Sequence, residues 1–304
     1  MRLLVSHPDA SALGAWCRAL RAALPAATVA PWDAHAAAAD YAVGWAVPTA
    51  LFAAQPSLKG FFCAGAGVDD LLASPAVPTS LPLYRVEDAG MGEQMADYCS
   101  AAVLGWFTQR EAYARQQAAR LWRELPPQSR ASWRIGLYGA GALGTVVGAR
   151  FAALGFPVQC CSRRALASGS VDFDRFLGAS RVLILLAPLT PETRGRFGAR
   201  ELALLPPGAC VINVARGGLL VEAALLAALD AGHVAAAALD VFASEPLPPE
   251  HPFWRHPRVQ VTPHAAAYTL IEPAAAQIAA AIGTLEAGTP ASALSCRVDR
   301  GRGY

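Results

Sequence analysis

The apolar positions of the chain fall into short runs of β character that alternate with longer runs rich in alanine and leucine. Such alternation is typical of an α/β protein, in which helices cover a parallel sheet. In the first third of the chain, the pattern predicts strands at residues 2–6, 41–47, 58–63 and 83–86, and helices at residues 11–24 and 51–55.

The run from residue 92 to residue 119 begins GEQMADYCSAAVLGWF and is amphipathic. Its apolar spacing predicts one long helix. Because it lies between two α/β series, we expect this helix to cross between two domains. The proline-interrupted segment LPPQSRAS follows and predicts a loop.

A second α/β series begins at Trp133. Its predicted strands are RIGLYG, PVQCCS, VLILLA, ACVINVA, AAAALDVF and VQVTPH. The run LVEAALLAALDAGHV predicts a helix that ends at a glycine, as helices often do. Beyond Tyr268, the run AAAQIAAAIGTLEAG predicts one more helix.

Composition narrows the class of protein. With 304 residues the chain is long enough for two domains, and 54% hydrophobic and 16% charged residues indicate a large folded core. The formal net charge of +2 is too slight to suggest a nucleic-acid or membrane partner. No run is long and apolar enough to span a bilayer.

The N-terminal sequence MRLLVSHPDA is more typical of a first strand than of a signal peptide. The 7 cysteines include no CxxC pair, and their odd number argues against a disulfide framework. We therefore expect a cytoplasmic protein whose cysteines are all buried as small hydrophobic residues. The histidines and cysteines show no metal-ligand spacing, so no metal site is expected.

Gly139, Gly141 and Gly144 form a GxGxxG motif between a predicted strand and a predicted helix, the context in which the motif binds a dinucleotide. The first glycine permits a tight turn, the second lets the backbone approach a pyrophosphate, and the third lets the helix pack closely. The helix start, at Ala142 and Leu143, offers N–H groups to phosphates. We predict a dinucleotide site here.

The next predicted strand ends in VQCCSRR, where an NAD-selective site carries an acid for the ribose 2′-hydroxyl. No acid stands there. Ser162 can donate a hydrogen bond to a 2′-phosphate, and Arg163 or Arg164 can pair with it. The stretch therefore favours NADPH as cofactor, with NAD at lower affinity, although an arginine pair can also be a plain solvated surface.

Charged and titratable residues follow three later strands. NVARGG contains Arg216, LDVFASEP contains Asp240 and Glu245, and VTPHAAA contains His264. The carboxyl ends of parallel strands line the ligand crevice of such a sheet. Arginine can clamp a carboxylate, histidine can exchange a proton near neutral pH, and a carboxylate can orient the histidine. Each residue alone has a structural explanation, but together they predict a catalytic set.

Gly217 and Gly218 follow Arg216 directly. We expect them to let the backbone turn sharply after the strand.

The motifs GAGALG, LAPLTPETRG, INVARGG, ALDVFASEPLP and VTPHAA stand in this order across nearly the whole chain. In this they resemble the D-isomer-specific 2-hydroxyacid dehydrogenases. The segments GAGVDDLL, EDAGMGEQMADY and VDRGRGY further resemble a subgroup of that family that reduces glyoxylate and hydroxypyruvate.

The resemblance implies a doubly wound parallel sheet, the Rossmann cofactor domain, inserted into a smaller flavodoxin-like α/β substrate domain. The substrate domain is expected at residues 1–97, the cofactor domain at 98–267, and a C-terminal helix and tail that return to the substrate domain at 268–304. It also implies a homodimer.

Roles of single residues follow from the same resemblance. Arg216 is expected to bind the substrate carboxylate and carbonyl, His264 to act as acid and base, and Glu245 to partner His264. The small-molecule substrate is a 2-oxo acid, reduced with NADPH by hydride transfer: glyoxylate to glycolate, or hydroxypyruvate to D-glycerate.

Further contacts are also implied. The backbone at Ala66 and Gly67 is expected to hold the other side of the substrate carboxylate. Trp45 is expected to wall the pocket, although a core tryptophan is an equally fair interpretation. Pro188 is expected to line the cofactor, and Asp240 to face the nicotinamide carboxamide.

One departure from the subgroup, and several alternatives, stay open. Cys161 stands where the subgroup is expected to have an aromatic residue, which could alter the adenine pocket. A dehydrogenase of another 2-hydroxy acid, or a corepressor-like protein that senses NAD(P)H, would retain the same motifs. Formate enzymes carry glutamine where Glu245 stands. A short-chain dehydrogenase is excluded, because its Tyr/Lys pair cannot be built from Lys59, the one lysine of the chain.

Overall fold

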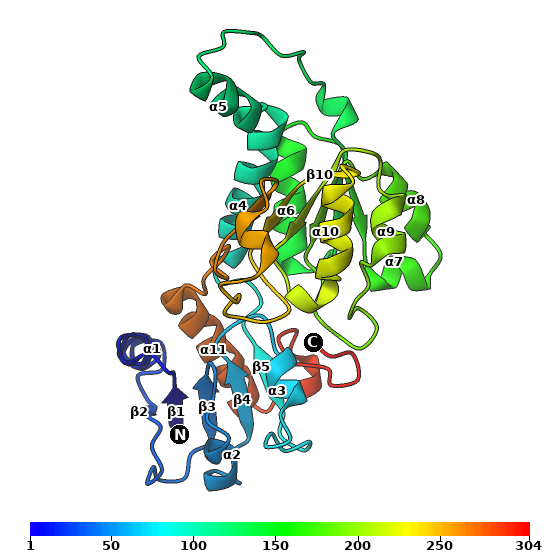
Figure 1. Cartoon of the computed structure of the whole chain (residues 1–304). Coiled ribbons are helices and arrows are strands. Elements are labelled where there is room, and N and C mark those ends of the chain that lie inside the picture. Colours follow the sequence, from blue (N-terminus) through cyan, green and yellow to red (C-terminus); the bar gives the residue numbers. More distant parts are fainter. The chain divides into compact units, whose positions relative to one another are not determined.

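The computed structural model describes residues 1–304, and the chain divides into two compact units (Figure 1). Unit 1 comprises Met1–Met91 and Thr269–Tyr304, and unit 2 comprises Gly92–Tyr268. The first division comes earlier than the expected 97/98 boundary, because helix α4 (Met91–Phe107) lies almost wholly in unit 2.

Unit 1 is built on a five-stranded sheet in the order β2-β1-β3-β4-β5, with every pair parallel. This is the flavodoxin-like strand order. The strands are β1 (Arg2–Ser6), β2 (Thr28–Pro31), β3 (Tyr41–Gly44), β4 (Gly60–Cys63) and β5 (Leu83–Arg85). Strand β2 was not expected, because it is a short edge strand that ends in a proline.

The helices of unit 1 are α1 (Ala10–Ala23), α2 (Ala50–Ala54), α3 (Asp69–Ala73) and α11 (Ile271–Glu286). Helix α1 packs against α11, which comes from the C-terminal part of the chain. After α11, the tail pairs with the edge strand β5: Arg85 N–H donates to Cys296 O at 2.9 Å, and Val298 N–H donates to Leu83 O at 2.9 Å. The tail therefore extends this sheet by one antiparallel segment.

Unit 2 contains a six-stranded parallel sheet in the order β11-β10-β9-β8-β6-β7. Its strands are β6 (Ile135–Tyr138), β7 (Val158–Cys161), β8 (Val182–Leu185), β9 (Ala209–Asn213), β10 (Val234–Leu239) and β11 (Val259–Val261). All six predicted strands are present, and the doubly wound Rossmann prediction is confirmed. The chain turns back between β6 and β8, so the switch point of the fold lies there.

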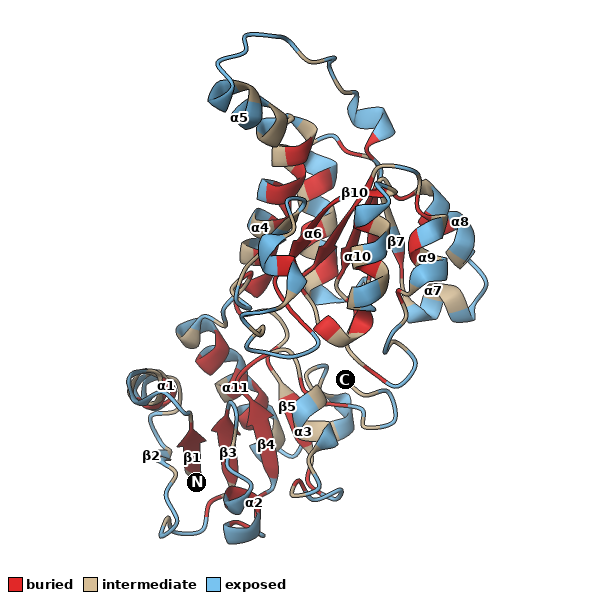
Figure 2. Ribbon diagram, viewed as in Figure 1, coloured by how far each residue is buried: buried red, intermediate tan, exposed pale blue.

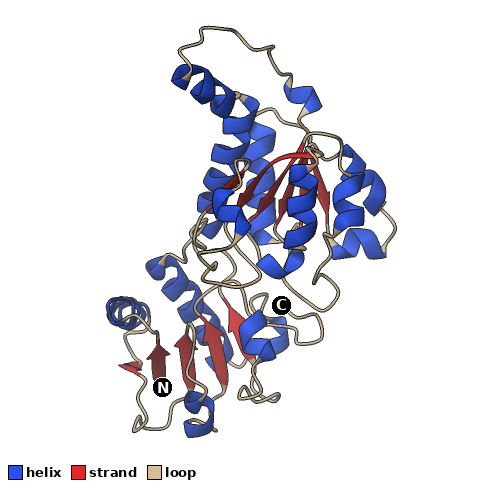
Figure 3. Cartoon of the chain, in the orientation of Figure 1, coloured by secondary structure: helices blue, strands red, loops and turns tan.

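Helices cover both faces of this sheet (Figure 3). The helices of unit 2 are α4, α5 (Arg110–Ala118), α6 (Ala142–Ala153), α7 (Arg163–Ala167), α8 (Phe173–Ala179), α9 (Ala199–Leu204) and α10 (Glu222–Asp230), with short 3₁₀ turns at Arg130–Ser132, Gly217–Leu219 and Pro252–Arg255. Most strand residues are buried between the two helical layers (Figure 2). No helix of the structure is long and apolar enough to cross a membrane.

The prediction of a single helix over residues 92–119 is wrong. Helix α4 ends at Phe107, and Gln109 adopts a left-handed backbone with φ of 57° before α5 begins. Helix α4 buries Ala96, Cys99 and Val103, whereas α5 buries no residue. No core contact therefore forces the two segments into one axis.

The expectation for the cysteines is correct for five of seven. Cys160 is exposed and Cys296 is half-buried, and all seven are free thiols. Cys161 is fully buried in the core of unit 2, where burial raises the pKa of its thiol to about 11. Its side chain therefore packs inside the fold, and the expectation that it alters an adenine pocket is not supported.

Candidate active site

The glycine-rich turn joins β6 to α6 at the carboxyl edge of the unit 2 sheet. Gly139 has a φ of +117°, and a Cβ built there would lie 2.6 Å from Ala187 N. A Cβ on Gly144 would overlap Gly139 O, whereas one on Gly141 would meet no atom within 4 Å. The first and third glycines are thus required by the fold, and the second leaves open space beside the backbone.

Helix α6 begins at Ala142, and no side chain caps it. The N–H groups of Ala142, Leu143 and Gly144 lie in the first turn, where no helix carbonyl can accept their hydrogen bonds. These donors and the positive end of the helix dipole form a ready anion site next to the open space at Gly141.

The SRR stretch follows β7, the neighbour of β6. Ser162 caps α7: its Oγ accepts a hydrogen bond from Ala165 N–H at 3.1 Å, which leaves its O–H free to donate. Arg163 and Arg164 are exposed in the first turn of α7. Gly139 N–H donates to Cys161 O at 2.9 Å, which fixes the SRR stretch beside the glycine-rich turn.

The loop after β8 lies on the other side of β6. Pro188 is half-buried, and its carbonyl accepts a hydrogen bond from the Thr193 hydroxyl at 2.8 Å. In the same loop, a hydrogen bond from the Thr190 hydroxyl lowers the pKa of Glu192, and the charge of Arg163 contributes in the same direction. The expected cofactor residues thus follow three adjacent strands, β7, β6 and β8.

Arg216 follows β9 and is half-buried, with its Nη1 donating to Ala215 O at 2.7 Å. Asn213 braces the turn, since its Nδ2 donates to Arg216 O at 3.0 Å. Neither Gly217 nor Gly218 has a positive φ, so a sharp turn is not the reason for these glycines. Instead, a Cβ on Gly217 would overlap the backbone of Phe242, so this glycine lets the β9 loop lie directly against the β10 loop.

Glu245 and His264 meet across the loops that follow β10 and β11. Glu245 Oε2 lies 2.8 Å from His264 Nδ1, and its Oε1 accepts a hydrogen bond from Phe242 N–H at 2.9 Å. Both side chains are partly exposed. Because Nδ1 is occupied by Glu245, Nε2 is the imidazole nitrogen available to a substrate.

Asp240 is 1% exposed and anchors the loop that carries His264. Its carboxylate accepts hydrogen bonds from Thr262 Oγ1 at 2.6 Å, from Ala265 N–H at 2.8 Å and from Ala266 N–H at 2.9 Å. His264 itself has a φ of 54°, a left-handed conformation, and its N–H donates to Asp240 O at 2.8 Å. The carboxamide contact expected of Asp240 stays a prediction.

The network extends from Thr262 to helix α4. Tyr98 Oη lies 2.7 Å from Thr262 Oγ1, and since Thr262 donates to Asp240, Tyr98 is the donor to Thr262. Burial raises the pKa of Tyr98 to about 12, so its O–H stays protonated. Sequence reasoning missed Thr262 and Tyr98, because ordinary polar residues far apart in the chain carry no local signal.

The substrate-side residues expected in unit 1 follow β3 and β4. Trp45 is 39% exposed, so it is not a core tryptophan, and a Cβ on Gly65 would lie 2.5 Å from its ring. Ala66 and Gly67 come next, and Ala66 O accepts a long hydrogen bond from Arg85 Nη1 at 3.5 Å. The three residues share one sheet edge, and their substrate contacts stay predictions.

No group of three or more His, Cys, Asp or Glu side chains is arranged to hold a metal ion.

Residues 100–266 match the family model described as "D-isomer specific 2-hydroxyacid dehydrogenase, NAD binding domain". The chain belongs to this family.

Similar proteins align with this 2-hydroxyacid dehydrogenase homologue over its whole length. Glyoxylate/hydroxypyruvate reductase A of Yersinia enterocolitica is 41% identical over 317 residues, with 100% of both chains covered. A D-isomer specific 2-hydroxyacid dehydrogenase from Xanthobacter autotrophicus Py2, solved in complex with NADPH and MES, is 36% identical with a TM-score of 0.88 and covers 100% of this chain and 99% of its own.

A third protein is similar over the same length. The NADPH-dependent glyoxylate/hydroxypyruvate reductase of Sinorhizobium meliloti, solved with NADP and sulfate, is 33% identical with a TM-score of 0.88. The alignment covers 100% of this chain and 99% of that one. These likenesses extend through unit 1 as well as the matched domain of unit 2.

Proposed function

We propose that this dehydrogenase homologue reduces small 2-oxo acids with NADPH, and that glyoxylate and hydroxypyruvate are its substrates. The observation that carries the proposal is the hydrogen bond of 2.8 Å between Glu245 and His264 on the sheet edge that also bears the glycine-rich turn. The substrates named for the Yersinia and Sinorhizobium relatives point to the same pair of oxo acids.

The residues present fit a dinucleotide phosphate. The open space at Gly141 and the uncapped N-terminus of α6 suit the pyrophosphate. Ser162, Arg163 and Arg164 would hold the 2′-phosphate, because they offer one hydroxyl and two guanidinium groups at the end of β7. When bound, NADPH supplies the hydride that reduces the keto carbon.

The chain's own residues perform the remaining steps. Arg216 binds the substrate carboxylate and stabilises the negative charge that develops on the carbonyl oxygen. His264 donates the proton to that oxygen from Nε2, while Glu245 fixes the ring through Nδ1. The product is the 2-hydroxy acid: glycolate from glyoxylate, or D-glycerate from hydroxypyruvate.

Initial rates of NADPH oxidation with glyoxylate, hydroxypyruvate and a panel of other 2-oxo acids test the proposal, and NADH serves as the comparison cofactor. We expect turnover that is highest with the two named acids and faster with NADPH than with NADH. A preference for another 2-oxo acid would change the substrate and keep the reaction. NADPH binding without turnover of any acid would favour a cofactor-sensing protein.

A homodimer is the second part of the proposal. The chain between α5 and the 3₁₀ turn at Arg130–Ser132 exposes 99% of Trp122 and 49% of Leu121. Exposed apolar groups of this size mark interaction surfaces. We expect Trp122→Ser with Leu121→Ser to convert a dimer into a monomer in sedimentation velocity, and Trp254→Ser, at a tryptophan 50% exposed elsewhere, to leave the dimer intact. A monomeric native protein would exclude the dimer.

We also propose that the protein is cytoplasmic. Fractionation of the source cells tests this location.

A further inference from the structure

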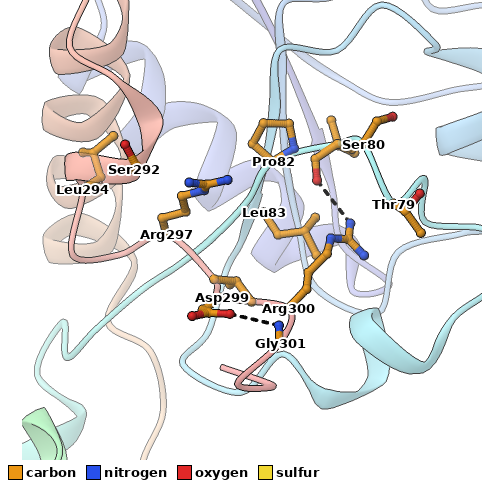
Figure 4. A pocket seen from close by; sticks show the side chains of 12 residues that line it. Thr79, Ser80, Pro82, Leu83, Ser292, Leu294, Arg297, Asp299, Arg300 and Gly301 are labelled. Carbon is orange, nitrogen blue, oxygen red and sulfur yellow. Dashed lines mark hydrogen bonds between the residues drawn. The ribbon is translucent and has the colours of Figure 1, made fainter.

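Unit 1 contains a cavity of about 510 Å³ far from the edge that carries Ala66 and Gly67. Two segments line it, residues 79–83 ahead of β5 and residues 292–301 of the C-terminal tail (Figure 4). Since β4 and β5 are parallel, the residues ahead of β5 lie at the opposite end of the sheet from those that follow β4. The family model covers residues 100–266, so the cavity lies outside the matched domain.

The cavity is a built feature of the fold, because both walls are tied together. The tail is bonded to β5 through Val298 N–H and Leu83 O, and Tyr84 forms an antiparallel bridge with Arg297. Arg300 Nη2 crosses to the other wall, where it donates to Pro78 O at 2.7 Å and to Leu81 O at 3.1 Å.

The charge in the cavity is positive. Arg297 is exposed, and its guanidinium makes no hydrogen bond or ion pair within the protein. Arg300 is half-buried, and burial lowers its pKa from the ordinary arginine value. The lining carboxylate, Asp299, is already engaged by the N–H groups of Gly301 and Arg302 and by Arg302 Nε at 3.1 Å. Figure 4 shows the Arg297 side chain directed away from Asp299.

Neutral polar and apolar groups complete the lining. The hydroxyl-bearing residues Thr79, Ser80 and Ser292 stand beside the arginines, while Leu81 and Leu294 offer apolar surface. The volume lies within the range of about 300–1,000 Å³ that is usual for small-molecule sites. It is larger than a bare phosphate needs, so the complementary ligand has a carbon body as well as a charged group.

We propose that this cavity binds a small organic molecule bearing a multivalent oxyanion, either a phosphate ester or a polycarboxylate. The planar forks of Arg297 and Arg300 bind the oxyanion, and the hydroxyls and the leucines contact the body of the ligand. All of its lining residues belong to unit 1, whereas Arg216 and the SRR stretch belong to unit 2.

Isothermal titration of the full chain, saturated with NADP⁺, tests the proposal with 3-phosphoglycerate and citrate as probes and glycerol as the uncharged control. The titrations are repeated in Arg216→Gln, in which the proposed substrate-carboxylate site is lost. We expect saturable binding of at least one oxyanion probe to both proteins and none of glycerol. Binding of 3-phosphoglycerate alone identifies a phosphate ligand, and binding of citrate alone identifies a polycarboxylate.

Arg297→Gln is the decisive variant, because this exposed, unpaired side chain is removed without disturbing the fold. It should weaken the binding about tenfold or more, the loss expected for a charge-assisted contact. Arg18→Gln on α1 removes the same charge from an exposed position outside the cavity and should bind as the native protein does. Absence of oxyanion binding, or equal binding by Arg297→Gln and the native protein, would overturn the proposal.

Discussion

The sheet edge of unit 2 carries the proposed catalytic side chains at one end and the proposed cofactor-selecting side chains at the other, and the two ends hold them in different ways. At the β10–β11 end, Glu245 is bonded to His264 and to the backbone of Phe242, and the loop beneath is fixed by the buried Asp240. At the β7 end, Arg163 and Arg164 project from the five-residue helix α7, which one serine caps.

The difference corresponds to the two tasks. Proton transfer requires heavy atoms within about 2.6–3.2 Å of one another, so the donor must be held rigidly. Recognition of a 2′-phosphate depends mainly on charge and on the planar guanidinium forks of arginine, so exposed side chains on a short capped helix are sufficient. Substitutions at the first end should therefore change rate and stability, whereas those at the second should change cofactor choice alone.

The largest effect is expected for His264→Ala. Loss of the general acid should lower kcat by about 10²–10⁴-fold. Binding of NADPH, followed by the fluorescence of the reduced nicotinamide, should be nearly unchanged, because the cofactor residues lie on other strands. His251→Ala is the control, since this histidine pairs with Glu222, the first residue of α10. Normal turnover by His264→Ala would exclude the acid role.

Asp240→Asn should come next. The amide places an N–H group against backbone donors in a buried site, so the free energy of unfolding should fall by about 2–4 kcal/mol. Urea unfolding measures this loss of stability. The value of kcat should also fall, because the loop that carries His264 loosens. Asp230→Asn, at an exposed carboxylate, should change stability by less than about 0.5 kcal/mol. Equal stability of the two variants would show that the loop does not depend on Asp240.

Replacement of Arg163 and Arg164 by glutamine should lower kcat/KM for NADPH about 10- to 100-fold and leave that for NADH nearly unchanged. Unfolding should shift by no more than about 0.5 kcal/mol, because both side chains are exposed. Arg175→Gln with Arg200→Gln removes the same charge from α8 and α9 and serves as the control. An unchanged ratio of NADPH to NADH activity would assign the cofactor preference elsewhere.

The smallest effect is expected for Tyr98→Phe, which should cost about 1 kcal/mol of unfolding free energy and reduce kcat a few-fold. Burial raises the pKa of Tyr98 from 10.0 to about 12, so the neutral phenol stabilises the fold fully below pH 10. That contribution is lost as the pH rises from about 10 toward 12. The free energy of unfolding, measured with urea over this pH range, should therefore decline less steeply in Tyr98→Phe than in the native protein or in the control variant Tyr268→Phe. Parallel declines in all three would contradict the assignment.

The sequence predicts the sheet of unit 2 and the loops of its edge because their signals are local. A glycine motif between a strand and a helix, or a histidine directly after a strand, is visible within about ten residues. The break at Gln109 escapes such reasoning, since α5 buries no residue and nothing in the apolar spacing marks the left-handed backbone of Gln109.

Partnerships between distant segments also escape it. Tyr98 and Thr262 are separated by 164 positions, and no local pattern marks either as part of one network. The need for Gly217 likewise depends on Phe242, which becomes its neighbour only when β9 and β10 pair. Sequence motifs thus name the side chains at the edge, and the fold explains what keeps them in place.

The left-handed backbone at position 264 has an energetic consequence. For a residue with a Cβ this conformation costs about 1–2 kcal/mol, and glycine or asparagine tolerates it better. Glycine at this position would relieve that cost, but it would also remove the imidazole that is bonded to Glu245. The loop therefore gives up some conformational stability to present this one ring at the sheet edge.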